Sequence, residues 1–336
     1  MSATLPTTCT LTGFTPTGRL HLGNLLGAIQ PIVAAQATTD TVVFLADLCA
    51  LTVTHDPADV RARTVEQATL LLAAGLEPER ALLYVQSQVP AHTELHYLLE
   101  CATGVGEAQR MIQYKEKAAR QKHVRLSLLT YPVLMASDIL LHDTHEVPVG
   151  TDQSQHVELT RTVATRFNAR YGPTFVVPRA VHPTAGARVM DLAQPAVKMS
   201  KSSETDAGTL FLLDPPDAIR RKVQRAVTDS ATVVGYNPAT RPGVANLLEI
   251  LAACAGGSPA ALAEELPSYG HLKRAVVEAV VAVLQPIQRR HAELARDPGY
   301  VRGVLADGAA RARERTGDVV ARAKRAIGLV DSAPSI

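Results

Sequence analysis

Two short polar segments carry residue types that suit the binding of phosphates. The first, GFTPTGRLHLGNLLGA at residues 13–28, passes from a strand-like pattern through Pro and Gly directly into a helix-like stretch. Such a junction presents free backbone amides and the positive end of a helix to an anion. Gly23 lacks a side chain, so a flat group such as adenine could pack against its backbone, while His21 and Asn24 add polar groups. The alternative is an ordinary strand–turn–helix junction.

The second segment is KMSKS at residues 198–202, roughly 175 residues further along the chain. It places two cations and two hydroxyls close together, a short distance before Gly208. Such donors favour a mobile loop that binds a polyanion and stabilises the charge that develops as a pyrophosphate leaves. Taken alone, the segment could equally be a solvated surface loop, so the combination of the two segments carries the argument.

The elements that must position these segments alternate between strand and helix over the first two thirds of the chain. Strands are expected at residues 9–14, 42–48, 81–89 and 146–150, and helices at 22–35, 56–75, from 90 onward, through most of 104–143, and at 152–171. Asp56 before Pro57 is a strong helix start, because Asp caps free amides and Pro suits the first turn. This rhythm predicts an α/β fold with a Rossmann-like, doubly wound parallel sheet and helices on both faces.

Beyond residue 203 the pattern becomes almost entirely helical. Helices are expected at residues 217–226, 244–255, 259–265, 273–296 and 300–327. We therefore predict two domains: a Rossmann-like catalytic domain at 1–203 with a helical insertion at about 104–145, followed by a mainly helical domain at 204–336.

The composition fits a soluble globular protein, with 46% hydrophobic and 20% charged residues. A net charge of +2 does not exclude nucleic acid as a partner, since only one face need be basic. The four cysteines (Cys9, Cys49, Cys101 and Cys254) lie far apart and give neither a zinc spacing nor a disulfide framework, so no metal site is expected. No apolar run approaches the ~20 residues of a membrane helix and no secretory signal is visible, so the expected location is the cytoplasm.

Together, the two polar segments resemble the paired ATP-binding motifs of class I aminoacyl-tRNA synthetases. HLGN at residues 21–24 corresponds to the family's HIGH element, and residues 198–202 match its KMSKS loop. Within this class the resemblance is most specific for the bacterial-type tryptophanyl-tRNA synthetases. It is carried by ADLCALTVTHDP at 46–57, YPVLMASDILLHD at 131–143 and VPVGTDQSQHVELTR at 147–161.

The resemblance implies a ligase that joins L-tryptophan to tRNA(Trp) in two steps. The tryptophan carboxylate attacks the α-phosphorus of ATP, which gives tryptophanyl-adenylate and diphosphate, and the terminal ribose of tRNA then takes the aminoacyl group and releases AMP. ATP is a substrate, Mg²⁺ accompanies it without a dedicated protein site, and no protein nucleophile is required. The helical domain is expected to bind the tRNA anticodon, and the protein is expected to be a homodimer without a membrane attachment.

The resemblance also assigns roles to individual residues. Catalysis falls to His21, Asn24, Lys198 and Lys201. ATP is expected to contact Thr15, Pro16, Thr17, Gly23, Asn24, Gly150, Thr151, Asp152, Val189, Lys198, Met199, Ser200, Lys201 and Ser202. Tryptophan is expected to contact Asp138, Tyr131, Met135 and Gln153. Lys117, from a basic segment at 110–125, is a candidate for the triphosphate, with a solvated helix face as the alternative.

Asp138 is the residue expected to set amino-acid specificity. Three of its four neighbours three and four positions away are apolar (Leu134, Met135 and Leu141), which turns the carboxylate inward if the segment is helical. A buried carboxylate requires a partner. In the family, the matching Asp accepts the indole N–H of tryptophan, and a donor of this kind suits an acceptor-only group. Pairing with a local Arg or backbone amide is the alternative.

Several positions depart from the family pattern. Thr15 stands where Gln is common, Cys49 where His is usual, Leu25 where Tyr is common, and Ser203 where Asp often follows KMSKS. Thr15 and Cys49 belong to segments that line the amino-acid end of the site, so the polar contacts there differ from those of relatives. Two other functions remain open: a tyrosyl-tRNA synthetase, and a regulatory paralogue that does not charge tRNA.

Overall fold

A five-stranded parallel β-sheet forms the centre of the larger lobe. The structure is a computed structural model that describes residues 8–119, 121–150, 153–181, 189–200, 205–231 and 233–330. The strand order is β3-β2-β1-β4-β5, with β1 at Cys9–Phe14, β2 at Asp40–Leu45, β3 at Ala81–Val85, β4 at Glu146–Pro148 and β5 at Arg179–Val181. Because β1 is flanked by β2 on one side and by β4 on the other, the sheet is doubly wound, as predicted.

Three expected strands end earlier than predicted, among them the one at 146–150, which ends at Pro148, and one strand was not expected. The run at 42–48 ends as a strand at Leu45, because Asp47 begins the short helix α3 (Asp47–Ala50). The run at 81–89 is extended only to Val85 and then forms a 3₁₀ turn, η2 (Gln86–Gln88). β5 could not be expected from an apolar run, because this strand has three residues and none of them is buried.

The helix predicted over residues 22–35 contains one wide turn. α1 (Leu22–Asn24) passes into the π-helical segment η1 (Leu25–Ile29) and then into α2 (Gln30–Ala35). Pro31 lacks an amide hydrogen, so the carbonyl of Gly27 cannot receive the ordinary helical hydrogen bond. The wide turn accommodates this missing donor without ending the helix.

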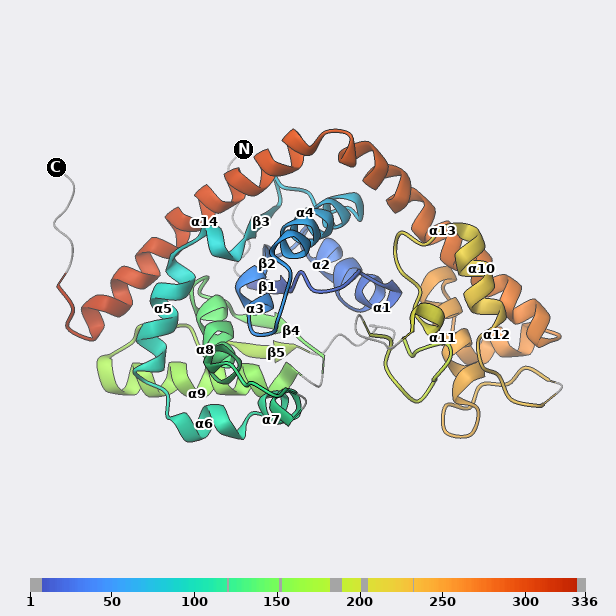
Figure 1. The fold of residues 1–336 in the computed structure, drawn as a ribbon, viewed down its shortest axis with the longest axis horizontal. Coiled ribbons are helices and arrows are strands. Elements are labelled where there is room, and N and C mark those ends of the chain that lie inside the picture. The colour runs from blue at the N-terminus through green and yellow to red at the C-terminus, as the bar shows by residue number, and fades with distance from the viewer. Residues whose placement is uncertain are drawn as a thin grey trace.

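Successive strand residues face opposite sides of the sheet, and helices cover both sides (Figure 1). On one side the strands pack against α4 (Pro57–Ala73) and the helical stretch from α1 to α2, through a core that includes Leu25, Ile29, Val43, Leu71 and Leu83. α4 begins as predicted, since the Asp56 side chain accepts a hydrogen bond from the Ala58 amide at 2.8 Å.

The other side of the sheet packs against the helical insertion and the helix that follows it. α5 (Ala91–Glu100) precedes the predicted insertion, which comprises α6 (Val105–Arg110), α7 (Ile112–Ala119) and α8 (Leu126–Leu140), and α9 (Ser154–Tyr171) follows β4. The core on this side includes Leu11, Phe44, Tyr84, Ile139 and Val157. Residues from α8 and α9 therefore reach the sheet directly.

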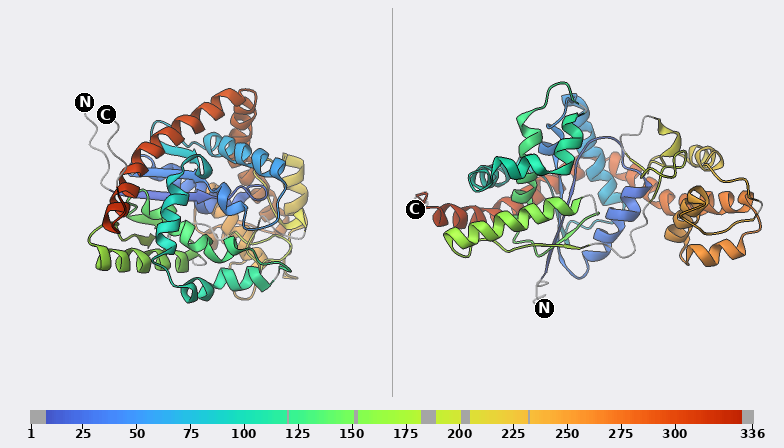
Figure 2. Two further views of the ribbon diagram at one scale, coloured as in Figure 1. Left: turned by 60° about the vertical axis from the view of Figure 1, so that its left-hand side comes forward. Right: turned by 90° about the horizontal axis from the view of Figure 1, so that it is seen from below.

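A second lobe of helices and loops lies beside the sheet (Figures 1 and 2). It contains η4 (Asp206–Gly208), α10 (Pro216–Gln224), α11 (Pro242–Ala255), α12 (Pro259–Glu265) and most of α13 (Tyr269–Ala295). In the part of the chain that the structure describes, no single helix is long and apolar enough to span a membrane; the bent pair α11 and α12 meets that criterion by length and composition only.

α13 leaves the second lobe and ends beside α4, and the last helix, α14 (Pro298–Ala326), runs from there across the sheet-bearing lobe (Figure 1). Gly308 approaches β3 so closely that a Cβ built on it would lie 1.8 Å from the Leu83 carbonyl oxygen. Ala309 and Ala312 belong to the same core as the strands. The division of the chain at residue 203 stays a prediction, to which the structure adds that α14 packs against the sheet-bearing lobe.

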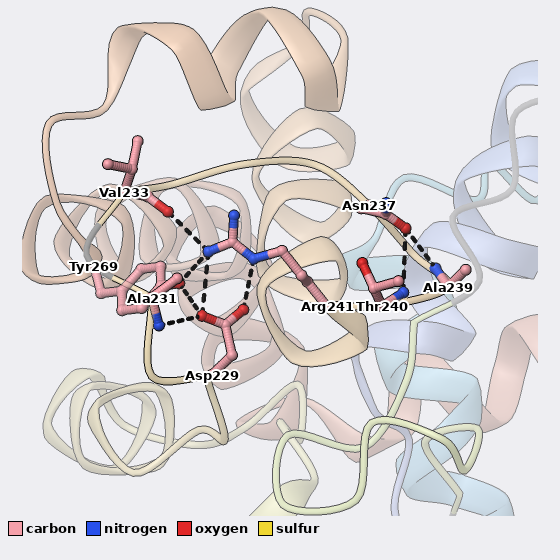
Figure 3. Close-up of polar contacts among 8 residues, drawn as sticks. All are labelled: Asp229, Ala231, Val233, Asn237, Ala239, Thr240, Arg241 and Tyr269. Carbon is pink, nitrogen blue, oxygen red and sulfur yellow. Dashed lines mark hydrogen bonds and ion pairs between the residues drawn. The ribbon is translucent and has the colours of Figure 1, made fainter.

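The loop between α10 and α11 is held by a cluster of polar side chains (Figure 3). Arg241 donates from Nε to Oδ2 of Asp229 at 2.6 Å and from Nη2 to the Val233 carbonyl at 2.7 Å. The Tyr269 hydroxyl, at the start of α13, contacts both Asp229 and Arg241. Hydrogen bonds from Arg241 and then from Tyr269 hold the pKa of Asp229 well below its usual range. The cluster therefore ties the loop to α13.

Candidate active site

The loops that follow four of the strands meet at the carboxyl edge of the sheet. Thr15 follows β1, Cys49 lies in the helix after β2, Gln86 follows β3 and Gly150 follows β4. In doubly wound sheets ligands bind at this edge, beside the point where the strand order reverses. That point lies between β1 and β4 in this sheet, so the residues of the first predicted motif stand next to it.

The chain leaves β1 through a tight turn. Thr15 is half-buried, Pro16 is buried and Thr17 is exposed, and the Thr17 amide donates to the Thr15 carbonyl at 2.8 Å. The turn leads directly into the segment that begins α1. All three residues were predicted to contact ATP, and the turn places them together at the edge of the sheet.

His21 and Gly23 lie at the start of the helix, as predicted. The buried His21 donates its backbone amide to Oδ1 of Asn24 at 3.1 Å, which satisfies one free amide of the first turn. A Cβ built on Gly23 would lie 3.1 Å from the His21 ring and 3.5 Å from Cβ of Val189. Val189 was predicted to lie against adenine, and the structure brings it to Gly23 from a distant part of the chain.

The KMSKS segment begins beside Val189. The Met199 amide donates to the Val189 carbonyl at 3.0 Å, and Met199 is buried whereas Lys198 is exposed. Ser200 is half-buried and is the last described residue of the segment. The predicted site residues that lie outside the described part of the chain are Thr151, Asp152, Lys201 and Ser202, together with the family departure at Ser203.

The chain after KMSKS is joined to the first motif. The Leu22 amide donates to the Leu210 carbonyl at 2.8 Å. Arg19 forms an ion pair with Asp206, and its guanidinium lies 3.7 Å from the centroid of the Phe211 ring. The two phosphate-type motifs therefore belong to one structural unit, although neither motif indicated these contacts.

Asp138 is buried, with 2% of its surface exposed, as its helical neighbours predicted. Its partners in the described part of the chain are neither an Arg nor a backbone amide. Nε2 of Gln86 donates to Oδ1 at 2.7 Å, and Nδ1 of His92 lies 2.6 Å from the same oxygen. Both hydrogen bonds that the described residues make to this carboxylate end on Oδ1, so Oδ2 is the oxygen that can accept a further donor.

Tyr131, one of the residues expected to contact tryptophan, is held at its hydroxyl. The hydroxyl donates to Oε1 of Gln113 at 3.2 Å and lies 2.9 Å from Nε2 of His156. Burial raises the pKa of Tyr131. Nζ of Lys117 lies 5.0 Å from the centroid of the Tyr131 ring, and burial lowers the pKa of Lys117. Lys117 thus stands against a residue of the expected tryptophan pocket, and its role toward the triphosphate stays a prediction.

The family departure at Cys49 lies beside Asp138. Cys49 and Met135 are half-buried and pack against the same core. Burial, and next the charge of Asp138, raises the pKa of the Cys49 thiol, so this thiol is neutral at neutral pH. At the start of α9, the backbone amide of Gln153 donates to the Gly150 carbonyl at 2.9 Å. Among the described residues, no three His, Cys, Asp or Glu side chains are grouped so as to hold a metal ion.

Sequence reasoning missed the residues that support Asp138. Beyond Gln86 and His92, the Tyr84 hydroxyl lies 2.9 Å from Nε2 of His92 and 2.8 Å from Nε2 of His142. The one available signal was the position of Gln86, a polar residue directly after a wholly apolar strand. Tyr84 comes from β3, His92 from α5 and His142 from the turn after α8, and no local pattern links them.

Comparison with known proteins agrees with this geometry. The family model for tRNA synthetases class I (W and Y) matches residues 6–285. The chain is 57% identical over 325 residues to the Tryptophan--tRNA ligase 1 of Streptomyces avermitilis, covering 95% of this chain and 98% of that protein. It is 45% identical over 325 residues to the Tryptophan--tRNA ligase 2 of the same organism, covering 95% of this chain and 96% of that protein.

Solved structures give the same result. The tryptophanyl-tRNA synthetase from Mycoplasma pneumoniae superposes with a TM-score of 0.90 at 36% identity, over 96% of this chain and 98% of that one. The tryptophanyl-tRNA synthetase from Campylobacter jejuni complexed with ADP and tryptophane superposes with a TM-score of 0.83 at 31% identity, over 96% of this chain and 100% of that one. Tyrosyl-tRNA synthetase from Aeropyrum pernix gives 0.66 at 22% identity, which shows a shared fold alone. The chain therefore belongs to the class I tRNA synthetases of the W and Y family.

Proposed function

We propose that this chain ligates L-tryptophan to tRNA(Trp) with ATP, through tryptophanyl-adenylate, and releases AMP and diphosphate. The observation that carries the proposal is Asp138, a buried carboxylate whose partners among the described residues both bind Oδ1. Oδ2 can accept one more donor, and the indole N–H is a donor only. The relatives named tryptophan--tRNA ligase, and the Campylobacter jejuni structure with ADP and tryptophane, support the same substrates.

The same arrangement disfavours tyrosine as the substrate. A phenol hydroxyl accepts as well as donates a hydrogen bond. Nδ1–H of His92 and one N–H of Gln86 are committed to Oδ1, and the Gln86 side chain also hydrogen-bonds the Cys49 thiol. A phenol in this place would leave an acceptor unsatisfied, and discrimination built on such unpaired groups is large.

Adenylate formation requires no protein nucleophile, so the side chains act by position and charge. We propose that adenine lies against Gly23 and Val189, since the Val189 side chain approaches Gly23 at the start of α1. His21 and Asn24 align the reacting phosphate, and Lys198 and Lys201 stabilise the charge that develops on the leaving diphosphate. Mg²⁺ is proposed to arrive with ATP and to neutralise phosphate oxygens.

The rest of the proposed ATP and tryptophan sites follows the same edge of the sheet. The remaining ATP contacts are proposed at Thr15, Pro16, Thr17, Gly150, Thr151, Asp152, Met199, Ser200 and Ser202. Tyr131, Met135 and Gln153 are proposed to enclose tryptophan together with Asp138. The proposed role of Lys198 is supported by its exposure beside the buried Met199. Met199 anchors the backbone, so the Lys198 side chain can extend to a phosphate.

The helical lobe is proposed to bind the anticodon arm of tRNA. The terminal ribose then attacks the adenylate carbonyl with its 2′-hydroxyl, at the edge of the sheet. In this proposal residues 1–203 form the catalytic domain and 204–336 the tRNA-binding part, with α14 packed against the catalytic domain. We further propose that the protein works as a homodimer in the cytoplasm.

Amino-acid-dependent exchange of pyrophosphate into ATP tests the proposal. Purified protein is assayed with each of the twenty amino acids, and tryptophan alone is expected to support exchange at low concentration. Preferential exchange with tyrosine would assign the chain to tyrosine activation. Absence of exchange with every amino acid would assign it to a paralogue that does not charge tRNA.

A further inference from the structure

The residues that hold Asp138 continue inward as an unbroken buried polar chain. Asp138 meets His92, His92 meets the Tyr84 hydroxyl, and the hydroxyl meets His142, at 2.6, 2.9 and 2.8 Å in turn. All four residues are buried, with at most 2% of their surface exposed. Three separate elements contribute to the chain, because His92 lies in α5, Tyr84 in β3, and Asp138 in α8.

The geometry fixes which atoms donate. A carboxylate only accepts, so Nδ1 of His92 carries a proton and donates to Oδ1 of Asp138. If His92 is neutral, its Nε2 accepts from the Tyr84 hydroxyl, and the Tyr84 oxygen then accepts from Nε2–H of His142. If His92 were charged, the order would reverse, and His142 would carry its proton on Nδ1.

The environment of His142 distinguishes these two arrangements. Its Nδ1 is buried and has no hydrogen-bond partner among the described residues. A buried N–H without an acceptor is rare, whereas an acceptor without a donor is tolerated more easily. Burial also holds the pKa of His142 well below its ordinary value, so the ring is neutral. Each donor therefore points toward the carboxylate, in the order His142, Tyr84, His92, Asp138.

Hydrogen bonds to the backbone fix the positions of the two histidines. Oγ of Ser137, next to Asp138 in α8, donates to the His92 carbonyl at 2.8 Å and so locks α5 against α8. Nη2 of Arg315 in α14 donates to the His142 carbonyl at 3.1 Å. The backbone is therefore fixed at both histidines, which keeps the two imidazoles in place along the chain.

We propose that Tyr84 and His92 are positioning residues for amino-acid specificity: the donor chain through them holds Oδ1 of Asp138, so that Oδ2 is presented to the indole N–H. This inference rests on the proposed activation of tryptophan. Without the Tyr84 hydroxyl, Nε2 of His92 loses its donor, and Nε2–H of His142 is left buried without an acceptor. The imidazole of His92 is then held at Nδ1 alone, so it can tilt and carry Oδ1 of Asp138 away from its position.

The test compares tryptophan with β-(3-benzothienyl)alanine, in which sulfur replaces the indole N–H. The ratio of kcat/KM for the two substrates in pyrophosphate exchange reports recognition of that one donor. In Tyr84→Phe the ratio is expected to fall about tenfold, the effect of one misplaced hydrogen bond. The loss should appear in KM for tryptophan, with kcat at saturation changed less than about threefold because the phosphate groups are untouched.

Two substitutions of His92 separate positioning from simple space filling. His92→Asn retains an amide donor near the place of Nδ1, whereas His92→Leu retains none. The ratio should fall further in His92→Leu than in His92→Asn. Tyr171→Phe is the matched control, since this half-buried tyrosine packs 4.9 Å from Phe167 and its hydroxyl has no hydrogen bond among the described residues. Its ratio should equal that of the parent.

An unchanged ratio in both Tyr84→Phe and His92→Leu, or an equal loss for both substrates, overturns the inference. If Tyr84→Phe does not fold, the difference between His92→Asn and His92→Leu decides alone. If the parent protein activates tryptophan and the variants have the same ratio of kcat/KM values as the parent, only the positioning role is refuted. A parent protein that does not activate tryptophan overturns the proposed function as well.

Discussion

Replacement of Gly308 by Ala tests whether the docking of α14 on the sheet contributes to both stability and function. A Cβ at this position would lie 1.8 Å from the Leu83 carbonyl oxygen and 2.8 Å from its carbon. Since contacts of this kind do not approach closer than 3.0 Å, α14 would have to move by about 1.2 Å. Backbone atoms cannot yield by changing rotamer, so we place the overpacking cost near the upper end of its usual range, about 3 kcal/mol. The helix propensity of Ala offsets about 1 kcal/mol. We therefore expect a net loss of about 2 kcal/mol.

The same helix supplies the controls. Cβ atoms built on Gly303 and Gly317 meet no other atom within 4 Å. Gly303→Ala and Gly317→Ala should therefore stabilise the protein by up to about 1 kcal/mol, because only the propensity acts there. The three variants change the same residue type in the same element, so any difference between them reports the contact with β3.

Urea denaturation followed by far-ultraviolet circular dichroism measures the free energy of unfolding, since the chain contains no Trp for fluorescence. Tyr84 lies 3.5 Å from the added carbon, so Gly308→Ala should also raise KM for tryptophan more than KM for ATP. Equal stability of Gly308→Ala and Gly303→Ala would refute the close docking of α14 on β3.

Four further predictions concern the site and the helical lobe. Asp138→Ala should leave the indole N–H unpaired and lower kcat/KM for tryptophan by an amount equivalent to about 1–3 kcal/mol of transition-state free energy. An unchanged kcat/KM would refute the role of Asp138 in recognising the indole. Lys201→Ala should slow adenylate formation while leaving tryptophan binding nearly intact, as pre-steady-state kinetics would show; a collapse in tryptophan affinity would contradict its phosphate role. Restoring the usual polar residues in a Thr15→Gln, Cys49→His double variant should strengthen inhibition by a rigid tryptophan mimic, and equal inhibition constants would discard this explanation. Asp229 has a lowered pKa in the folded state, so its contribution to stability is present above the ordinary carboxyl pKa and is lost as pH falls through the lowered value. Asp229→Asn should therefore lower Tm at neutral pH, with a difference from the parent that narrows below about pH 4, and a difference independent of pH would contradict the cluster.

The parts of the fold that depend on local patterns could be predicted from the sequence. Buried strands appeared as apolar runs, and Asp56 marked the start of α4 because a cap acts on amides within its own turn. The burial of Asp138 followed from neighbours on one helix. Its partners did not, because Gln86 and His92 come from other elements and meet Asp138 only in the folded chain.

The packing of α14 against the sheet also could not be predicted from the sequence. Helical periodicity shows that a helix has an apolar face but not which surface that face covers. Glycine inside a helix is unfavourable and can mark a close approach. Gly303, Gly308 and Gly317 all lie within α14, yet only Gly308 touches the strand backbone, so the sequence could not distinguish it from the other two.

The central claim is that this chain transfers tryptophan to tRNA. The most direct measurement is aminoacylation of a tRNA(Trp) transcript by the purified protein, with radiolabelled tryptophan and tyrosine supplied in parallel with ATP. We predict stoichiometric charging with tryptophan, negligible charging with tyrosine, and loss of charging when ATP is omitted. Charging with tyrosine, or adenylate formation without transfer of tryptophan to tRNA, would contradict the account.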